Sequence, residues 1–221
     1  MDNILASIDA AAPVLEKLGP YKEGWGQLMR VRIAALALTF LGFLVGAASA
    51  QTPIKMVALG HSFFATQAGP SPQGYPEQLR AALSAKGYST TLSNAGVYGD
   101  TTDGVARRLD RAVPDGTDVV LLAIGANDIR KGASASAVTK EVEAIISRLR
   151  AKRVEIIALV SQEVSWTVQA APDVTVIKYP WGSLPPDMVA LGHATSAGNA
   201  KLVELSLPAV EQVVAKVRQK R

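Results

Sequence analysis

The residues from Asp118 to Asp128 read DVVLLAIGAND, and this stretch indicates the class of fold. Its apolar run ends at Gly125, as expected for a strand that is buried on both faces of a sheet. Further strands are predicted at 54–59, 88–94, 154–160 and 174–177. Helices are predicted at 75–86, 101–112 and 135–152 and from Ser196 onward, where Pro208 should kink or split the last helix. Strands that alternate with helices predict a parallel α/β sheet in a three-layer α/β/α sandwich.

Composition excludes several classes of function. The chain has 221 residues, 48% of them hydrophobic, which is enough apolar material for one buried core. It has no Cys, and therefore no disulfide or thiolate metal site. The net charge of +4 is spread along the chain, and no basic run is interleaved with aromatic residues, so no nucleic-acid partner is expected. Neither glycine-rich nucleotide-binding motif is present.

The segment from Met29 to Ala50 has the features of a signal peptide. Two arginines precede an apolar stretch, and Ala48-Ser49-Ala50 offers the small residues that signal peptidase accepts. Cleavage after Ala50 would leave a folded domain at 51–221 in a periplasmic or secreted protein, with no stable membrane partner. An uncleaved membrane anchor is the alternative. Residues 1–28 are interpreted as an extension that is not translated, with Met29 as the true start, or as a short amphipathic helix.

Polar turns follow the predicted strands. Gly60-His61-Ser62 follows the first strand, residues 94–101 follow the second, and Gly125–Asp128 follows the third. A further candidate, His193, lies just before the last helix. Because ligands bind beyond the carboxyl ends of the strands in an open parallel sheet, these turns are expected to converge on one site.

The residue types in these turns suit acyl transfer. The hydroxyl of Ser62 would act as the nucleophile, with His193 as its base. His61 is a poorer base because it is adjacent to Ser62, where side chains diverge. The backbone N–H groups of Ser62 and Gly99 and the side-chain amide of Asn127 would form an oxyanion hole.

These blocks resemble the SGNH hydrolase superfamily, also called GDSL esterases. The match runs through Gly60–Phe63, Asn94–Thr102, Gly125–Asp128 and His193. The spacing is similar to that of the arylesterase and thioesterase/lysophospholipase branch. The resemblance implies a flavodoxin-like parallel sheet, serine-dependent hydrolysis of small acyl or aryl esters or thioesters, a small-molecule ester as partner, and neither a metal nor an organic cofactor.

Two positions depart from the family pattern. The first block has His61 in place of Asp, and Ala190 stands three residues before His193, where the family has the acid of the triad. The nearest upstream acid is Asp187, which would have to reach Nδ1 of His193 through a longer loop; otherwise a backbone carbonyl would orient the ring. Three aromatic residues of this region would line an acyl or aryl pocket or pack on the sheet edge: Trp166, Tyr179 and Trp181.

The departures leave more than one function open. An active esterase is the first hypothesis, and a catalytically weakened protein of the same fold that binds a ligand is the second. A carbohydrate deacetylase is the alternative substrate class within the enzyme hypothesis. The sequence sets neither the natural substrate nor the oligomeric state.

Overall fold

A computed structural model describes residues 52–66, 69, 71–161, 164, 167–169, 171–179, 182 and 184–221. The chain divides into two compact units, Met1–Ala50 and Gln51–Arg221. The predicted extension at 1–28 and signal peptide at 29–50 lie outside the described residues, as do Trp166 and Trp181. No helix in the described part of the chain is both long and apolar enough to cross a bilayer.

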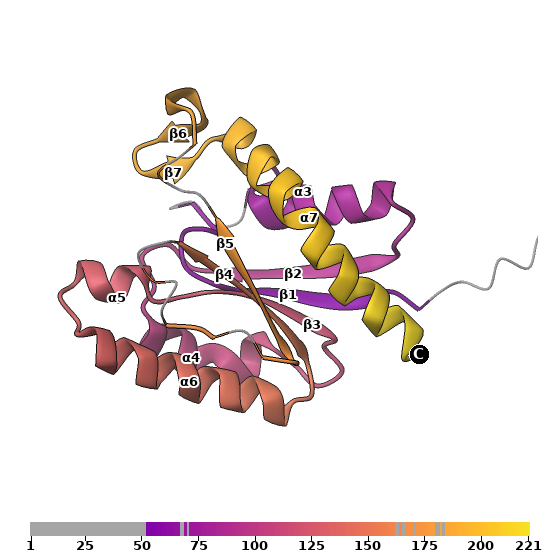
Figure 1. Ribbon diagram of the computed structural model, residues 1–221, viewed down its shortest axis with the longest axis horizontal. Helices are drawn as coiled ribbons and strands as arrows, with labels where there is room; N and C mark the ends of the chain where they lie inside the picture. Colours follow the sequence, from indigo (N-terminus) through magenta and orange to yellow (C-terminus); the bar gives the residue numbers. More distant parts are fainter. Residues whose placement is uncertain are drawn as a thin grey trace, which may run out of the picture. The chain divides into compact units, whose positions relative to one another are not determined.

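The second unit is built around one parallel sheet (Figure 1). The strand order is β2-β1-β3-β4-β5, which is the flavodoxin-like order that the resemblance implies. The strands are β1 (Ile54–Gly60), β2 (Thr90–Gly96), β3 (Val119–Ala123), β4 (Glu155–Ser161) and β5 (Val174–Tyr179). The helices are α3 (Tyr75–Ala85), α4 (Thr102–Ala112), α5 (Ala126–Arg130), α6 (Ala135–Ala151) and α7 (Ser196–Gln219).

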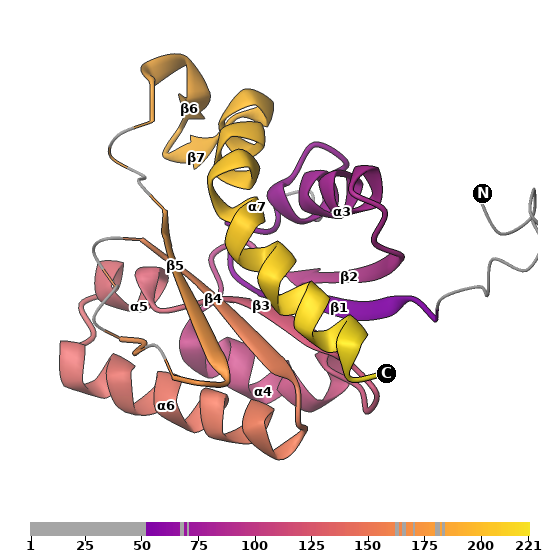
Figure 2. The ribbon, with the colours of Figure 1, turned by 45° about the vertical axis from the view of Figure 1, so that its right-hand side comes forward.

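Helices cover both faces of the sheet, so the predicted three-layer α/β/α sandwich is confirmed (Figures 1 and 2). The helices α3 and α7 lie on one face, and α4 and α6 lie on the other. Two apolar clusters fill the spaces between the layers, and the central strands β1 and β3 contribute to both. Because β3 is buried along its whole length, its sequence is a continuous apolar run.

Of the two predicted effects of Pro208, a kink or a split of the last helix, the structure excludes the split. The helix α7 continues from Ser196 to Gln219 and is not split. The proline ring removes the N–H that would bond to the carbonyl of Glu204. Both residues are exposed, so water can solvate that carbonyl without breaking the helix.

The register of the sheet aligns the carboxyl ends of β1, β2 and β3, where the predicted site residues begin. Gly60 at the end of β1 is paired with Gly96 of β2 and with Ala123 of β3. The turns that follow these three strands therefore begin at one level.

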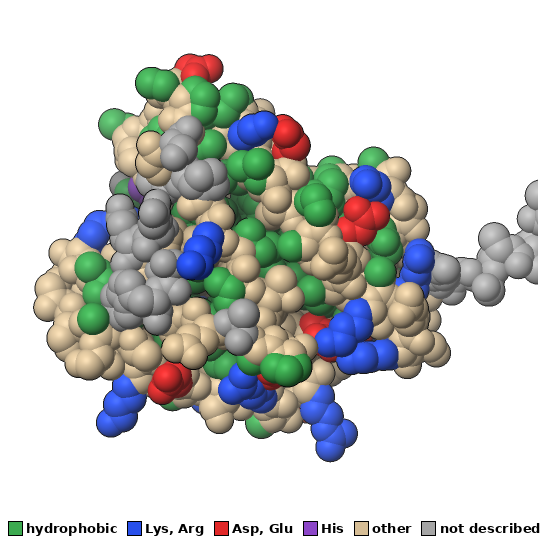
Figure 3. Space-filling view, in the orientation of Figure 1, with side chains coloured by type: hydrophobic (Ala, Val, Ile, Leu, Met, Phe, Trp, Pro, Cys, Tyr) green, Lys and Arg blue, Asp and Glu red, His purple; other side chains and the backbone are tan. Residues whose placement is uncertain are grey.

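On the face shown in Figure 3, Lys and Arg side chains are scattered and do not gather in one patch.

Candidate active site

Ser62 lies in the turn directly after β1. The backbone N–H of His61 donates to the carbonyl of Ala123 at 3.1 Å, and the N–H of Phe64 donates to the carbonyl of His61 at 3.0 Å. Gly60 is required here, because a Cβ at this position would lie 2.2 Å from the carbonyl oxygen of Ala123. These contacts fix the turn against the sheet and leave Ser62 half-buried at its carboxyl edge.

His193 is carried by a short hairpin that precedes α7. The 3-10 helix η3 (Pro186–Met188) leads into β6 (Val189–Ala190), which pairs antiparallel with β7 (His193–Ala194). The two turn residues both have positive φ, 51° at Leu191 and 75° at Gly192, as a two-residue hairpin of this kind requires. The hairpin is anchored by the N–H of Thr195, which donates to the carbonyl of Met188 at 2.9 Å.

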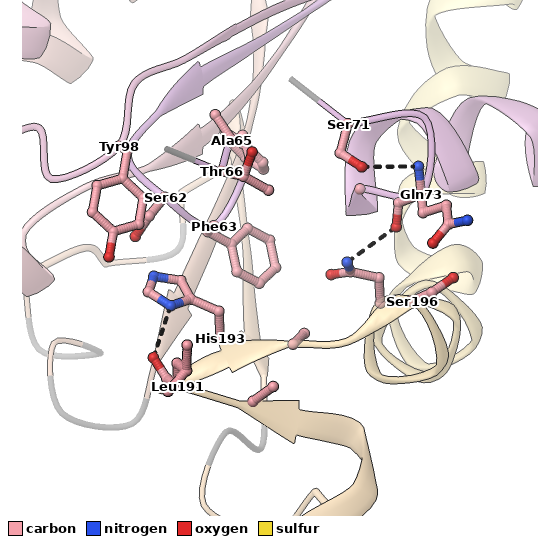
Figure 4. Close-up of a pocket in the computed structure, with 15 residues that line it drawn as sticks. Ser62, Phe63, Ala65, Thr66, Ser71, Gln73, Tyr98, Leu191, His193 and Ser196 are labelled. Carbon is pink, nitrogen blue, oxygen red and sulfur yellow. Dashed lines mark hydrogen bonds between the residues drawn. The ribbon is translucent and has the colours of Figure 1, made fainter. Parts of the chain in front are cut away.

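The imidazole of His193 has a defined orientation (Figure 4). Its Nδ1 lies 3.1 Å from the carbonyl oxygen of Leu191. A carbonyl only accepts, so Nδ1 carries the proton and Nε2 is left as an acceptor. In Figure 4 that second nitrogen points toward Ser62, and the ring of Tyr98 lies 5.3 Å from the imidazole. The ring is therefore in the tautomer that a general base needs.

Ser62 and His193 face each other without a hydrogen bond between them. Within the described residues, the hydroxyl of Ser62 has no hydrogen-bond partner, although both side chains line the same two cavities. Such separations are common in unliganded hydrolases and close when substrate binds. The structure thus brings together the predicted nucleophile and the predicted base.

Asp187 is not brought to His193. It is exposed in η3, and its backbone carbonyl accepts from the hydroxyl of Thr195 at 3.3 Å. In the described part of the chain, its carboxylate makes no hydrogen bond or ion pair with His193. The backbone carbonyl of Leu191 occupies the place of the acid, and the role of Asp187 remains a prediction without a supporting contact.

The three predicted oxyanion donors all have an N–H available. Among the described residues, no acceptor lies opposite the backbone N–H of Ser62 or Gly99. Gly99 has φ +71°, which favours glycine. The side-chain amide of Asn127 is buried; it donates one N–H to the carbonyl of Asp100 at 2.8 Å and has a second N–H left. Its oxygen accepts from Arg130 at 3.2 Å, so the amide is held from both sides.

Two ionic groups that the sequence prediction missed brace these turns. Arg108 of α4 donates to Asp100 at 2.9 Å, to the carbonyl of Ala95 at 2.5 Å and to the carbonyl of Gly60 at 2.9 Å. Buried Asp128 accepts from the backbone N–H and the hydroxyl of Thr102, at 3.0 Å each for Oδ2. An acid at the start of α4 is also favoured by the helix dipole. In the sequence, the only sign of these contacts was that Asp100 and Asp128 lie in the turns after predicted strands.

His61 is buried beside the nucleophile and is uncharged. Its Nδ1 accepts from the backbone N–H of Phe63 at 3.2 Å. Burial, followed by the positive charge of Arg130, lowers the pKa of His61 to about 4. Because Nδ1 is the acceptor, the single proton of the neutral ring is on Nε2.

Two cavities meet at Ser62. Both are lined by Ser62, Phe63, Leu191 and His193. The α3-side cavity, of about 410 Å³, continues along residues that include Thr66, Gln73, Tyr98, Ser196 and Asn199 (Figure 4). The α5-side cavity, of about 350 Å³, continues along His61, Ala126, Arg130, Ser161, Tyr179 and Gly192. A ligand bound at Ser62 therefore has a separate space on each side.

The aromatic residue Tyr179 serves both roles that its sequence position suggested. It lines the α5-side cavity, and its ring stacks on that of Phe63 at 4.7 Å between centroids. The residues that the structure describes contain no cluster of three His, Cys, Asp or Glu side chains that could hold a metal ion.

Comparison with known proteins agrees with this geometry. A relative from Vibrio mimicus named arylesterase is 31% identical over 121 residues, which cover 54% of this chain and 58% of that protein. The chain thus matches only 58% of the relative's length. Among solved structures, a psychrotrophic esterase, EstA, from Pseudoalteromonas sp. has a TM-score of 0.60 at 16% identity, over 72% of this chain and 97% of that chain. A lipase/acylhydrolase from Enterococcus faecalis has a TM-score of 0.58 at 21% identity, over 72% of this chain and 95% of that chain.

At these identities, the two structures show a shared fold. The sequence profile of the GDSL-like Lipase/Acylhydrolase family matches residues 58–206, from β1 into α7, and so includes every turn of the site. Well over half of the chain is covered, and the chain belongs to the GDSL-like lipase/acylhydrolase family.

Proposed function

We propose that this protein hydrolyses carboxylic esters through an acyl-enzyme on Ser62. The observation that carries the proposal is the hydrogen bond of 3.1 Å between Nδ1 of His193 and the carbonyl oxygen of Leu191. With its proton held on Nδ1 by the carbonyl of Leu191, the ring presents a basic Nε2 on the side of Ser62. Small acyl or aryl esters suit the two modest cavities, and the name of the Vibrio mimicus relative also favours aryl esters.

The reaction follows from these groups. The hydroxyl oxygen of Ser62 attacks the ester carbonyl while its proton passes to Nε2 of His193. The negative oxygen of the tetrahedral intermediate accepts hydrogen bonds from the N–H groups of Ser62 and Gly99 and the amide of Asn127. Collapse expels the alcohol, which takes the proton from His193. Water then attacks the acyl-enzyme with His193 again as base, and the acid and free Ser62 are released.

A weakened protein that binds a ligand is the second candidate. It is favoured because no carboxylate of the described residues contacts His193, and loss of the acid costs a protease triad about four orders of magnitude in turnover. Thioesters and acetylated carbohydrates are further substrate classes that the same chemistry would accept.

Hydrolysis of p-nitrophenyl acetate and butyrate by the purified protein, beside Ser62→Ala, tests the first candidate. We expect turnover by the wild type alone, and stoichiometric labelling of the wild type but not the variant by a serine-directed phosphonate. Circular dichroism of the variant serves as the folding control. Equal background rates from two folded proteins, with no labelling, would favour the binding protein.

We further propose export, based on the arginines, apolar stretch and small residues of 29–50. Expression of the full chain in a bacterium, followed by N-terminal sequencing of the periplasmic fraction, should yield a protein that begins at Gln51. A protein that retains Met29 in the membrane fraction would indicate the uncleaved anchor.

A further inference from the structure

Apart from His193, the polar side chains that line the α5-side cavity are hydrogen-bond donors or hydroxyls. Of the described residues that line it, none is Asp or Glu. Three side chains define its polarity: Arg130, His61 and Ser161. The cavity opens at Ser62, so a group attached to the reacting ester can occupy it.

Arg130 brings a positive charge to this cavity. It lies at the end of α5, is exposed, and donates one N–H to the amide oxygen of Asn127. No ion pair joins Arg130 to any acid in the described part of the chain. A guanidinium has five N–H donors, so most of them remain for a ligand. Among the residues that the structure describes, it is therefore a charge without a counter-ion at the edge of the site.

Two buried groups add further donors. His61 is 6% exposed and lines the cavity, with Nδ1 occupied by the N–H of Phe63 and its proton on Nε2. Ser161 at the end of β4 is 5% exposed, and its hydroxyl has no hydrogen-bond partner among the described residues. A buried hydroxyl without a partner costs free energy unless a ligand supplies one.

We propose that the α5-side cavity binds an anionic group, such as a carboxylate, carried by the ester substrate, with Arg130 as the main determinant of this specificity. This inference rests on the proposed ester hydrolysis. An anion fits the cavity better than a neutral acceptor does, because a carboxylate pairs the unopposed guanidinium and accepts several hydrogen bonds at once. The charge can lie on the acyl part or on the alcohol part of the ester, since both meet at Ser62.

Two matched pairs of esters separate these sources. The first pair is 4-acetoxybenzoate and 4-acetoxybenzamide, which differ in charge on the alcohol part. The second is mono-4-nitrophenyl adipate and its amide analogue, which differ in charge on the acyl part. The quantity compared is the ratio of kcat/KM for the anionic ester to that for the neutral ester. A general loss of catalysis, for example through Asn127, lowers both values and cancels in this ratio.

In one of the two pairs, Arg130→Gln should lower this kcat/KM ratio about five- to tenfold. The expected loss is smaller than that for a buried charge-assisted hydrogen bond, because Arg130 is exposed and water screens its charge. Gln keeps an N–H donor for the amide oxygen of Asn127. Arg130→Lys keeps the positive charge, so its kcat/KM ratio should stay close to that of the wild type. Lys140→Gln is the matched control, because it removes one positive charge from the exposed side of α6 and lines neither cavity. The proposal is overturned if Arg130→Gln leaves the kcat/KM ratio unchanged in both pairs of esters.

Calorimetric binding to Ser62→Ala keeps this inference separate from the proposed function. The unhydrolysed anionic ester of the responding pair should bind at least about fivefold more tightly than its neutral partner, and adding Arg130→Gln should remove the difference. If the wild type turns over none of the esters while this charge-selective binding persists, ester hydrolysis fails and the cavity assignment stands. Equal binding of the charged and neutral esters overturns the cavity assignment.

Discussion

His61 is a buried base that folding holds neutral. Its pKa falls to about 4 through burial and the positive charge of Arg130, below the value of about 6.5 for a histidine in an unfolded chain. Between these two values the unfolded chain binds more protons than the folded protein. The stability that His61 contributes is therefore fully present above pH 6.5 and is lost as the pH falls toward 4.

The substitution His61→Asn tests this linkage. Asn offers an oxygen to the N–H of Phe63 but does not titrate. From pH 7.5 to pH 5, the wild type should lose about 2 kcal/mol more free energy of unfolding than the variant, as measured by urea titration. Parallel losses in the two proteins would show that His61 is protonated at little cost in the folded state.

At the scale of single residues, the sequence predicted a nucleophile and a base that line the same two cavities, but not the groups that hold them. Ser62 and His193 stand beside turns whose spacing follows the strands, so they could be predicted. The orienting carbonyl of Leu191 could be predicted only as one alternative, because any residue has a carbonyl. Arg130 gave no signal, since an arginine in a charged stretch is normally solvated.

The hairpin β6–β7 determines how His193 is oriented. Ala190 and His193 are cross-strand partners, so their side chains lie on one face with Cβ atoms about 5 Å apart. Position 190 is also where the family has its acid. A carboxylate introduced there would meet Nδ1 of His193 from the same face.

We therefore expect Ala190→Asp to raise kcat for p-nitrophenyl acetate by about tenfold or more, a fraction of what a triad acid contributes. Ala190→Asn has nearly the same size without the charge and should not give this increase. If Asp and Asn behave alike, the carbonyl of Leu191 already orients the ring as well as an acid would.

Elements with apolar periodicity were predictable, and those set by backbone geometry were not. The second strand was expected from Tyr88 but begins at Thr90. Tyr88 instead closes α3, since its N–H donates to the carbonyl of Leu83 at 3.0 Å after Gly87 turns with φ +81°. The hairpin at Leu191 was missed because leucine rarely adopts positive φ, and α5 was read as a turn because it is only one turn long.

On the scale of the whole molecule, a chain of buried contacts runs behind the site from the turn after β1 to α7. Phe63, directly after Ser62, packs on Tyr75 of α3 with ring centroids 5.0 Å apart. The hydroxyl of Tyr75 lies 2.7 Å from that of Ser206 in α7. The hairpin that carries His193 leads into the same helix, so this buried chain of contacts connects the nucleophile turn to the helix behind the base.

The direction of the Tyr75–Ser206 hydrogen bond predicts unequal costs for its two partners. Ser206 donates to the carbonyl of Val203 at 3.2 Å, so Tyr75 is the donor to Ser206. Burial raises the pKa of Tyr75, which keeps the phenol protonated. Ser206→Ala strands this buried donor and should cost about 2 kcal/mol of unfolding free energy, whereas Tyr75→Phe leaves Ser206 donating and should cost about 1 kcal/mol.

The double variant should be less destabilised than the sum of the two, because no donor is then left without an acceptor. Urea unfolding of the wild type, both single variants and the double variant measures this coupling. Esterase kcat at a temperature where all four are folded should stay unchanged, since neither side chain lines the α3-side or α5-side cavity. Additive costs would mean that the hydroxyls do not depend on each other. A fall in kcat would mean that the contacts between α3 and α7 set the geometry of His193 as well as the stability of the fold.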